Sequence, residues 1–472
     1  MNTALWPVYS IILGIFVTML AVMFSRERAI AAYWTALAAL AGSAVAIVVD
    51  WTSGQLPLML FHQAVTVDAF SVVVDGLVVL AAAGALAIGW NDRRYGSDFP
   101  VLTLLALLGM MVLGMANDFV VLFIGIELLS LPLYILAASR TGAPESGEAG
   151  LKYLLLGAFS SGILLFGLAL LYGASGTMII THLAPAQMIV PLAGAGLALS
   201  LVGLVFKLGI VPFHMWVPDV YEGSPLPVTS YMAFGTKVGA AAILMRFLFF
   251  GFAPAIGWWG PAMGYLAVLT MIVGNLLALA QKDLKRLLAY SGIANAGYLL
   301  VGIASHNIFG ARALLFYLLP YGLAVLAVFA IMAFVAGEAE SVSITDLTGL
   351  YQRSPWLAAF FAVAMLSMAG IPLTGGFVGK FYLLQAAWFS GQPGLAVGLV
   401  VGAMVGLAAY VRPLQRAFSK PEGGTAALEP IRWPLAGAIV LVVAVVGTIG
   451  LGVYPAPIVH IVNHSAAFYW LH

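Results

Sequence analysis

Two similar stretches, GLVFKLGIVPFHMW at residues 203–216 and AGIPLTGGFVGKFY at residues 369–382, decide the fold that the sequence predicts. Each lies in a long apolar segment, contains glycine and proline, and carries one lysine. Interrupted helices at corresponding places in two halves of a membrane protein indicate an internal repeat with a transport site at its core. We therefore expect two related halves, with Lys207 and Lys380 at equivalent breaks.

The composition requires a bilayer around most of the chain. Hydrophobic residues make up 63% of the 472 residues and charged residues only 8%, whereas a soluble domain has about 25% charged residues. The net charge of +1 gives no indication of nucleic-acid binding, and the absence of cysteine excludes thiol chemistry, disulfides and cysteine-ligated iron–sulfur clusters. The seven histidines lack ligand spacing, so we expect no metal and no redox cofactor bound to this chain.

Fourteen apolar segments have the roughly 20 residues that a spanning helix needs. The first, from Leu5 to about Phe24, follows no basic region or convincing cleavage site, so we interpret it as a retained helix and not a signal peptide. The predicted helices lie at about 5–24, 29–49, 69–90, 99–116, 119–138, 150–173, 189–213, 228–250, 257–280, 287–304, 308–336, 356–390, 394–412 and 434–453.

The predicted fold class is an all-α polytopic membrane protein with two five-helix repeats, helices 4–8 and 9–13, and broken helices 7 and 12. An odd number of helices per repeat inverts the second copy in the membrane. The predicted units are 1–98 for the first three helices, 99–250 and 257–412 for the two repeats, and 413–472 for helix 14 and the tail.

The basic residues predict the orientation of the chain. With an outward N-terminus, thirteen of the nineteen lie on one side, which the positive-inside rule makes cytoplasmic. On the other side we expect only Arg312 and perhaps Arg246, and both termini. The thirteen are Arg26, Arg28, Arg93, Arg94, Arg140, Lys282, Lys285, Arg286, Arg353, Arg412, Arg416, Lys420 and Arg432.

Glu127 lies in FIGIELLSLPLYIL, near the middle of the predicted helix 119–138. A charged side chain there costs about 2.5–3.5 kcal/mol on insertion scales, and such residues are usually functional. The alternative, a carboxylate that reaches the membrane surface from a helix end, does not fit this position. Pro132 frees the carbonyl of Leu128 and Pro212 that of Leu208, because proline has no N–H to donate. We expect hydrated breaks beside both Glu127 and Lys207, with ordinary kinks as the alternative.

Lys207 and Lys237 are predicted to be buried on neighbouring helices. Burial disfavours the charged form of a lysine, and a nearby carboxylate stabilises that form again. Because one glutamate cannot pair with three deep lysines, a set of static ion pairs is excluded, and a proton switch is favoured.

His214 is either a relay or a structural residue, and Lys152 at the start of the sixth helix either takes part in proton transfer or reaches the surface. Asp75 in the third helix is interpreted as structural. The stretch at 216–230 is predicted to form a rigid turn, with a proton-collecting mouth as the alternative.

Four stretches resemble subunit N of NADH-quinone oxidoreductase, respiratory complex I. The most specific is KLGIVPFHMWVPDVYEGSP at 207–225, and the others are LKYLLLGAFSSGILLFGLALLYG at 151–173, QKDLKRLLAYSGIANAGYLL at 281–300 and AGIPLTGGFVGKFYLL at 369–384. Together they cover much of residues 119–390. The resemblance implies an antiporter-like, proton-translocating subunit with fourteen helices and two inverted five-helix bundles.

The resemblance also implies roles for the buried charges. Glu127 matches the family's acid on helix five, Lys207 its partner on helix seven, Lys237 the central relay and Lys380 the terminal lysine. Lys152 matches a further lysine at the start of helix six. Many relatives have histidine where this chain has Asn295, which does not titrate, so a relay through that side chain is in doubt.

These observations predict a proton-translocating membrane-arm subunit of a complex I-type enzyme in a bacterial inner membrane. NADH, flavin, iron–sulfur clusters and quinone are expected on other membrane-arm and peripheral subunits, and no redox catalysis in this chain. The close alternatives are a cation/proton antiporter complex and a membrane-bound hydrogenase. The others are an independent solute carrier and a purely structural scaffold.

Overall fold

The computed structural model describes residues 3–25, 27–54, 56–90, 94–140, 142–337, 339, 341–420 and 431–467. Within these ranges, thirteen helices are long and apolar enough to cross a membrane. The remaining predicted span is a pair of shorter helices, α15 (Pro355–Ala369) and α16 (Gly375–Phe389), joined by residues 370–374. The structure therefore confirms the predicted fold class, an all-helical polytopic membrane protein.

The other α-helices follow the chain in regular order. They are α1 (Trp6–Phe24), α2 (Arg28–Ser53), α3 (Ala69–Ile88), α4 (Asp98–Met115), α5 (Phe119–Ala137), α6 (Pro144–Ser175), α7 (Val190–Leu208), α8 (Trp216–Gly223), α9 (Leu226–Tyr231), α10 (Lys237–Arg246), α11 (Ile256–Leu279), α12 (Leu284–Ala304), α13 (Ile308–Ala336), α14 (Leu350–Arg353), α17 (Pro393–Phe418), α18 (Leu435–Val453) and α19 (Ala456–Ala467). The π-helical segment η4 (Met232–Thr236) joins α9 to α10, and a second, η5 (Phe247–Gly251), continues α10, so that together they form one span, Leu226–Gly251.

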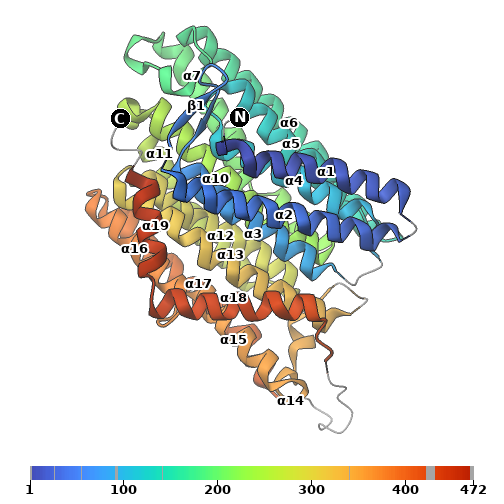
Figure 1. The fold of residues 1–472 in the computed structure, drawn as a ribbon. Helices are drawn as coiled ribbons and strands as arrows, with labels where there is room; N and C mark the ends of the chain where they lie inside the picture. The colour runs from blue at the N-terminus through green and yellow to red at the C-terminus, as the bar shows by residue number, and fades with distance from the viewer. Residues whose placement is uncertain are drawn as a thin grey trace.

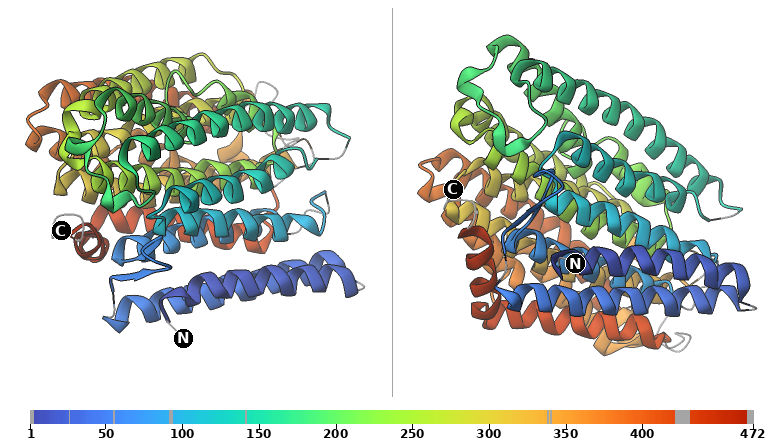
Figure 2. Two further views of the ribbon diagram at one scale, coloured as in Figure 1. Left: turned by 90° about the horizontal axis from the view of Figure 1, so that it is seen from above. Right: turned by 45° about the horizontal axis from the view of Figure 1, so that its top comes forward.

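The spanning helices lie side by side, and α1 and α2 form a pair at one edge of the bundle (Figure 2). The most central helices are buried over almost their whole length: α12 and the 226–251 span are each 94% buried over their most apolar stretch. The short helix α19 lies across one end of the bundle, beside the end of α16 (Figure 1). Charged groups on the central helices are therefore enclosed by protein and not by lipid.

Helix α7 ends where the sequence predicts a break. Gly209 adopts a left-handed conformation (φ 76°), and the N–H of Ile210 bonds back to the carbonyl of Val205 at 3.1 Å. This is the usual way to end a helix with glycine, because a residue without Cβ adopts this conformation at little cost. The second break repeats the geometry at Gly370 (φ 85°), where Ile371 bonds back to Leu366 at 3.0 Å.

Three local predictions were wrong or incomplete. A two-stranded antiparallel hairpin, β1 (Leu58–Leu60) and β2 (Val65–Val67), follows α2, and its strands are too short for their pattern to be read from sequence. Helix α19 was not predicted, because its 12 residues are fewer than a span needs. The stretch at 216–230 forms the helices α8 and α9 and not a rigid turn.

The orientation and the unit boundaries remain predictions. Two of the basic residues behind the orientation, Arg26 and Arg93, lie outside the described residues.

Candidate functional site

Lys207 is 4% exposed, and its ammonium group points at α5. Its Nζ donates hydrogen bonds to Ser130 Oγ at 2.7 Å and to Tyr134 OH at 3.2 Å. The rings of Tyr134 and Tyr153 also lie within 6 Å of the ammonium group, close enough for a favourable cation–π interaction. Hydroxyls and aromatic rings therefore replace the water that Lys207 loses on burial.

Glu127 lies on the same face of α5, one helical turn from Ser130. No nitrogen–oxygen contact within 4.0 Å joins it to Lys207, and its Oε1 is buried without a hydrogen-bond partner among the described residues. The ion pair predicted from the sequence is thus open in this structure. The unpaired carboxylate oxygen of Glu127 lies one turn from the serine that binds the Lys207 ammonium group, so movement of either charged side chain would change this arrangement.

Lys237, 2% exposed, uses a carbonyl that the break sets free. Its Nζ donates to the carbonyl of Leu208 at 3.1 Å. The sequence predicts that Pro212 leaves this acceptor outside the helical ladder. The last turn of α7 therefore lies between two ammonium groups, Lys207 on one side and Lys237 on the other.

Lys380, 6% exposed, lies after the second break and reaches back to it. Its Nζ donates to the carbonyls of Met368 at 2.7 Å and Ala369 at 3.2 Å. The ammonium group also rests on the ring of Tyr298, 4.5 Å from its centre. Lys207, Lys237 and Lys380 thus all have acceptors, as does a fourth buried lysine, Lys285, which bonds the carbonyls of Glu222 and Ser224 at 2.9 and 2.7 Å. Of the first three, only Lys207 has a carboxylate, Glu127, on a helix packed against it.

A group of hydroxyls surrounds Asn295 between Lys237 and Lys380. Tyr317 donates to Asn295 Oδ1 at 2.5 Å, and the Asn295 amide donates to the Ser291 carbonyl at 2.8 Å. The hydroxyls of Ser291 and Tyr410 lie 2.6 Å apart. A Cβ added at Gly292 would lie 3.5 Å from Tyr321 OH and 3.9 Å from Lys237 Nζ, so the group begins beside Lys237. A hydroxyl can both donate and accept a hydrogen bond, whereas the Asn295 amide cannot relay a proton. The hydroxyls around Asn295 can therefore pass a proton where the amide cannot.

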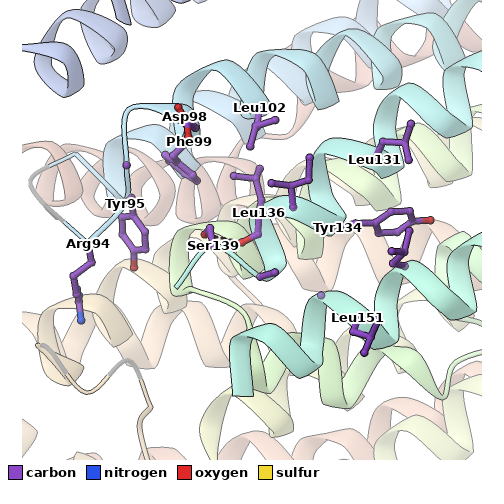
Figure 3. A pocket seen from close by; sticks show the side chains of 15 residues that line it. Arg94, Tyr95, Asp98, Phe99, Leu102, Leu131, Tyr134, Leu136, Ser139 and Leu151 are labelled. Carbon is purple, nitrogen blue, oxygen red and sulfur yellow. Dashed lines mark hydrogen bonds between the residues drawn. The ribbon is translucent and has the colours of Figure 1, made fainter. Parts of the chain in front are cut away.

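A cavity of about 1050 Å³ lies between α4, α5 and α6 (Figure 3). Arg94 and Asp98 line one end of it, and Tyr134 lies at the other. Because Tyr134 OH accepts a hydrogen bond from Lys207, the cavity ends one side chain away from the buried ammonium group. It was not predicted from the sequence, because it is formed by packing between helices.

Lys152 lies apart from Lys207, Lys237 and Lys380. It is 41% exposed and bonds Glu148 Oε1 at 2.7 Å and Asp219 Oδ2 at 2.8 Å. Arg286 bonds Asp219 at 3.1 Å and also bonds Glu222. The hydrogen bond from Lys152 holds the pKa of Asp219 below its usual value. This network ties α6, α8 and α12 together, which explains Lys152 without a role in proton transfer.

His214 lies between α7 and α8 and is partly buried. Burial lowers the pKa of its imidazole, so the neutral form predominates near pH 7. Its Nδ1 has no hydrogen-bond partner among the described residues. His214 therefore keeps a free polar atom near the first break, as a relay requires, but it touches none of the three lysines through a hydrogen bond.

Asp75 belongs to a separate polar group at the outer helices. Its Oδ1 is buried without a partner, close to Gly114. Nearby, Arg246 bonds both carboxylate oxygens of Asp68 at 2.7 Å and the carbonyl of Gly114 at 2.5 Å. The structure thus leaves the role of Asp75 open and gives Arg246 a structural one.

Sequence reasoning missed Ser130 and Tyr134. They follow Glu127 by three and seven residues, which places all three on one face of α5. That spacing was readable in the sequence, but hydroxyl side chains are common in helices and carry no charge to single them out.

The helical bundle and its breaks define a polytopic membrane protein with an antiporter-like fold. Residues 116–406, which include Glu127, Lys207, Lys237 and Lys380, match the family described as NADH:quinone oxidoreductase/Mrp antiporter, TM, and the chain belongs to this family.

Individual relatives agree with that assignment. The chain is 40% identical over 436 residues to NADH-quinone oxidoreductase subunit N of Gemmatimonas aurantiaca, covering 89% of this chain and 83% of that one. A chain of respiratory complex I from Thermus thermophilus matches with a TM-score of 0.84 and 35% identity, covering 97% of this chain and 100% of that one. A chain of the Mrp complex from Dietzia sp. matches with a TM-score of 0.89 at 23% identity, covering 100% of this chain and 98% of that one, which shows a shared fold alone.

Proposed function

We propose that this chain is the subunit N-type, proton-translocating part of the membrane arm of a complex I-type NADH-quinone oxidoreductase. The observation that carries the proposal is the open pair on α5 and α7: Lys207 is bonded to Ser130 and Tyr134, one turn from the unpaired carboxylate of Glu127. The similarity to subunit N supports assembly with other membrane-arm and peripheral subunits, which hold the redox cofactors. Coupling then consists of moving protons when quinone is reduced elsewhere in the complex.

In this mechanism Lys207 takes up a proton through the cavity that ends at Tyr134. Closing the gap between Glu127 and Lys207 stabilises the ammonium group, since an opposite charge within a few ångströms favours the charged form. Opening the gap, as seen here, leaves only hydroxyl acceptors and favours release. A change in a neighbouring subunit that shifts α5 would therefore drive the switch.

The released proton passes to Lys237, on the other side of the last turn of α7. From there it crosses the cluster of hydroxyls of Tyr321, Tyr317, Ser291 and Tyr410 and reaches Lys380. Water completes the contacts between these hydroxyls. Asn295 takes part as a positioning residue, because its amide holds hydroxyls without exchanging protons. Release then occurs at the outward end of α16.

The test uses the assembled enzyme in native membranes. Lys207→Met and Glu127→Gln each remove one titrating group and keep approximate size. We expect proton pumping coupled to quinone reduction to collapse, while electron transfer from NADH to a water-soluble artificial acceptor continues. Lys420→Met, at an exposed position, is the matched control and should pump normally. Unchanged pumping in both Lys207→Met and Glu127→Gln would refute the mechanism.

The same membranes separate this proposal from a cation/proton antiporter complex. Purification through a tag on this chain should recover flavin- and iron–sulfur-containing subunits. Recovery without any redox subunit would favour the antiporter assembly.

A further inference from the structure

A small pocket of about 180 Å³ lies between α13, α16 and α19, and none of Lys207, Lys237 and Lys380 lines it. Arg312 from α13, Tyr382 and Gln385 from α16, and Asn463 from α19 supply its polar groups. Phe316 and Val459 are among its apolar walls. The pocket therefore combines a cation, an aromatic hydroxyl and two amides with an apolar lining.

Arg312 is one of the two arginines predicted to lie on the outward side. Of the two arginines predicted there, Arg246 is bonded to Asp68. Arg312 has no carboxylate within 4.0 Å among the residues that the structure describes, and its Nε is buried without a hydrogen-bond partner. A guanidinium group needs acceptors when it leaves water. The neighbouring amides and hydroxyl are neutral, so no described residue compensates the charge of this partly buried guanidinium, and an anion would fit there.

The pocket lies near the start of α13 and the end of α16, at one end of the bundle. The Asn307 amide bonds the carbonyl of Ala386, and Phe309 packs on Phe389, so the start of α13 lies against the end of α16. Trp388 beside this contact is exposed, as is typical of residues at the membrane–water boundary. Helix α19 covers the same end of the bundle (Figure 1).

We infer that this pocket binds the phosphate group of a phospholipid, with the Arg312 guanidinium as its main ligand. Arginine matches two phosphate oxygens with its planar fork. Gln385, Asn463 and Tyr382 can donate to the remaining oxygens. The apolar walls favour a lipid over inorganic phosphate, because a free ion has no apolar part to place against Phe316 and Val459. A lipid bound in this way fastens α19 to α13 and α16.

The test uses the complete purified complex and does not depend on the proposed proton mechanism. Arg312→Gln keeps a polar side chain without the charge. After delipidation, vesicles of phosphatidylglycerol should raise the thermal midpoint of the wild-type complex, and the variant should bind this lipid roughly tenfold more weakly, the effect of losing one charge-assisted contact. Inorganic phosphate alone should give no increase. Lys420→Gln is the matched control.

A second variant keeps the inference testable if Arg312→Gln fails to assemble. Gln385→Glu places a carboxylate beside Arg312 within the same wall, so the arginine is paired and assembly is retained. Co-purified phospholipid should fall in this variant, since the added charge repels phosphate. Phospholipid retention equal to that of the wild-type complex in both variants, or protection of the wild-type complex by inorganic phosphate equal to that by the lipid, would overturn the inference. Loss of a neighbouring subunit with unchanged lipid content would also overturn it and identify a protein carboxylate as the partner.

Discussion

The two broken helices end alike and use their lysines differently. Both end at a left-handed glycine, Gly209 or Gly370, followed by an isoleucine that bonds back into the last turn. Lys207 precedes its break and points away from it, to hydroxyls on α5. Lys380 follows its break and bonds the carbonyls that the break exposes.

This difference indicates which of the two sites can be switched. Lys380 is held by two backbone carbonyls, which neither titrate nor change rotamer, and by the ring of Tyr298. Side chains hold Lys207, and Glu127, one turn from Ser130 on α5, has a carboxylate oxygen without a hydrogen-bond partner among the described residues. We infer that the conformational change that drives pumping acts at the first break. The second break then holds the last proton-transfer residue in a fixed position.

The largest expected effect comes from removing each lysine. Lys207→Met and Lys380→Met should both lower pumping by about a hundredfold, because a proton-transfer group is lost. Only Lys380→Met should also destabilise the complex, by about 1–3 kcal/mol, since Met368 and Ala369 then have buried carbonyls without this partner. Pumping assays in vesicles and thermal unfolding of the purified complex measure the two effects. Equal destabilisation by both variants would contradict the comparison.

The glycines offer a smaller and more local test. Alanine at Gly370 would place Cβ 2.9 Å from Lys380 Cδ, whereas alanine at Gly209 would place it 2.8 Å from Val217 Cγ2. Each should cost about 1–2 kcal/mol for the left-handed conformation, but only Gly370→Ala should also reduce pumping, because it displaces the lysine. Gly391→Ala is the matched control: φ is 71° and a Cβ there meets nothing within 4 Å, so it isolates the backbone cost. If Gly209→Ala reduces pumping more than Gly370→Ala, the two sites have been ranked wrongly.

The sequence predicts the breaks well and the contacts across them poorly. Gly209, Pro212 and Gly370 act on their own backbone, so their effect is local and readable. The distance between Glu127 and Lys207 depends on the side-chain conformations of residues on two helices. Sequence spacing does not predict those conformations. The hydroxyl group around Asn295 was missed for the same reason, since its members come from separate helices.

The smallest expected effect comes from single acceptors. Ser130→Ala removes one of the two hydroxyls that hold Lys207, at a cost of about 1 kcal/mol, and should slow pumping roughly fivefold. Lys380 has no equivalent, since its hydrogen-bond acceptors belong to the backbone. The nearest change, Tyr298→Phe, keeps the ring on which the ammonium rests and should pump almost normally. Initial pumping rates at matched levels of assembled complex make the comparison. A larger loss in Tyr298→Phe than in Ser130→Ala would show that side chains, and not the backbone, control the second break as well.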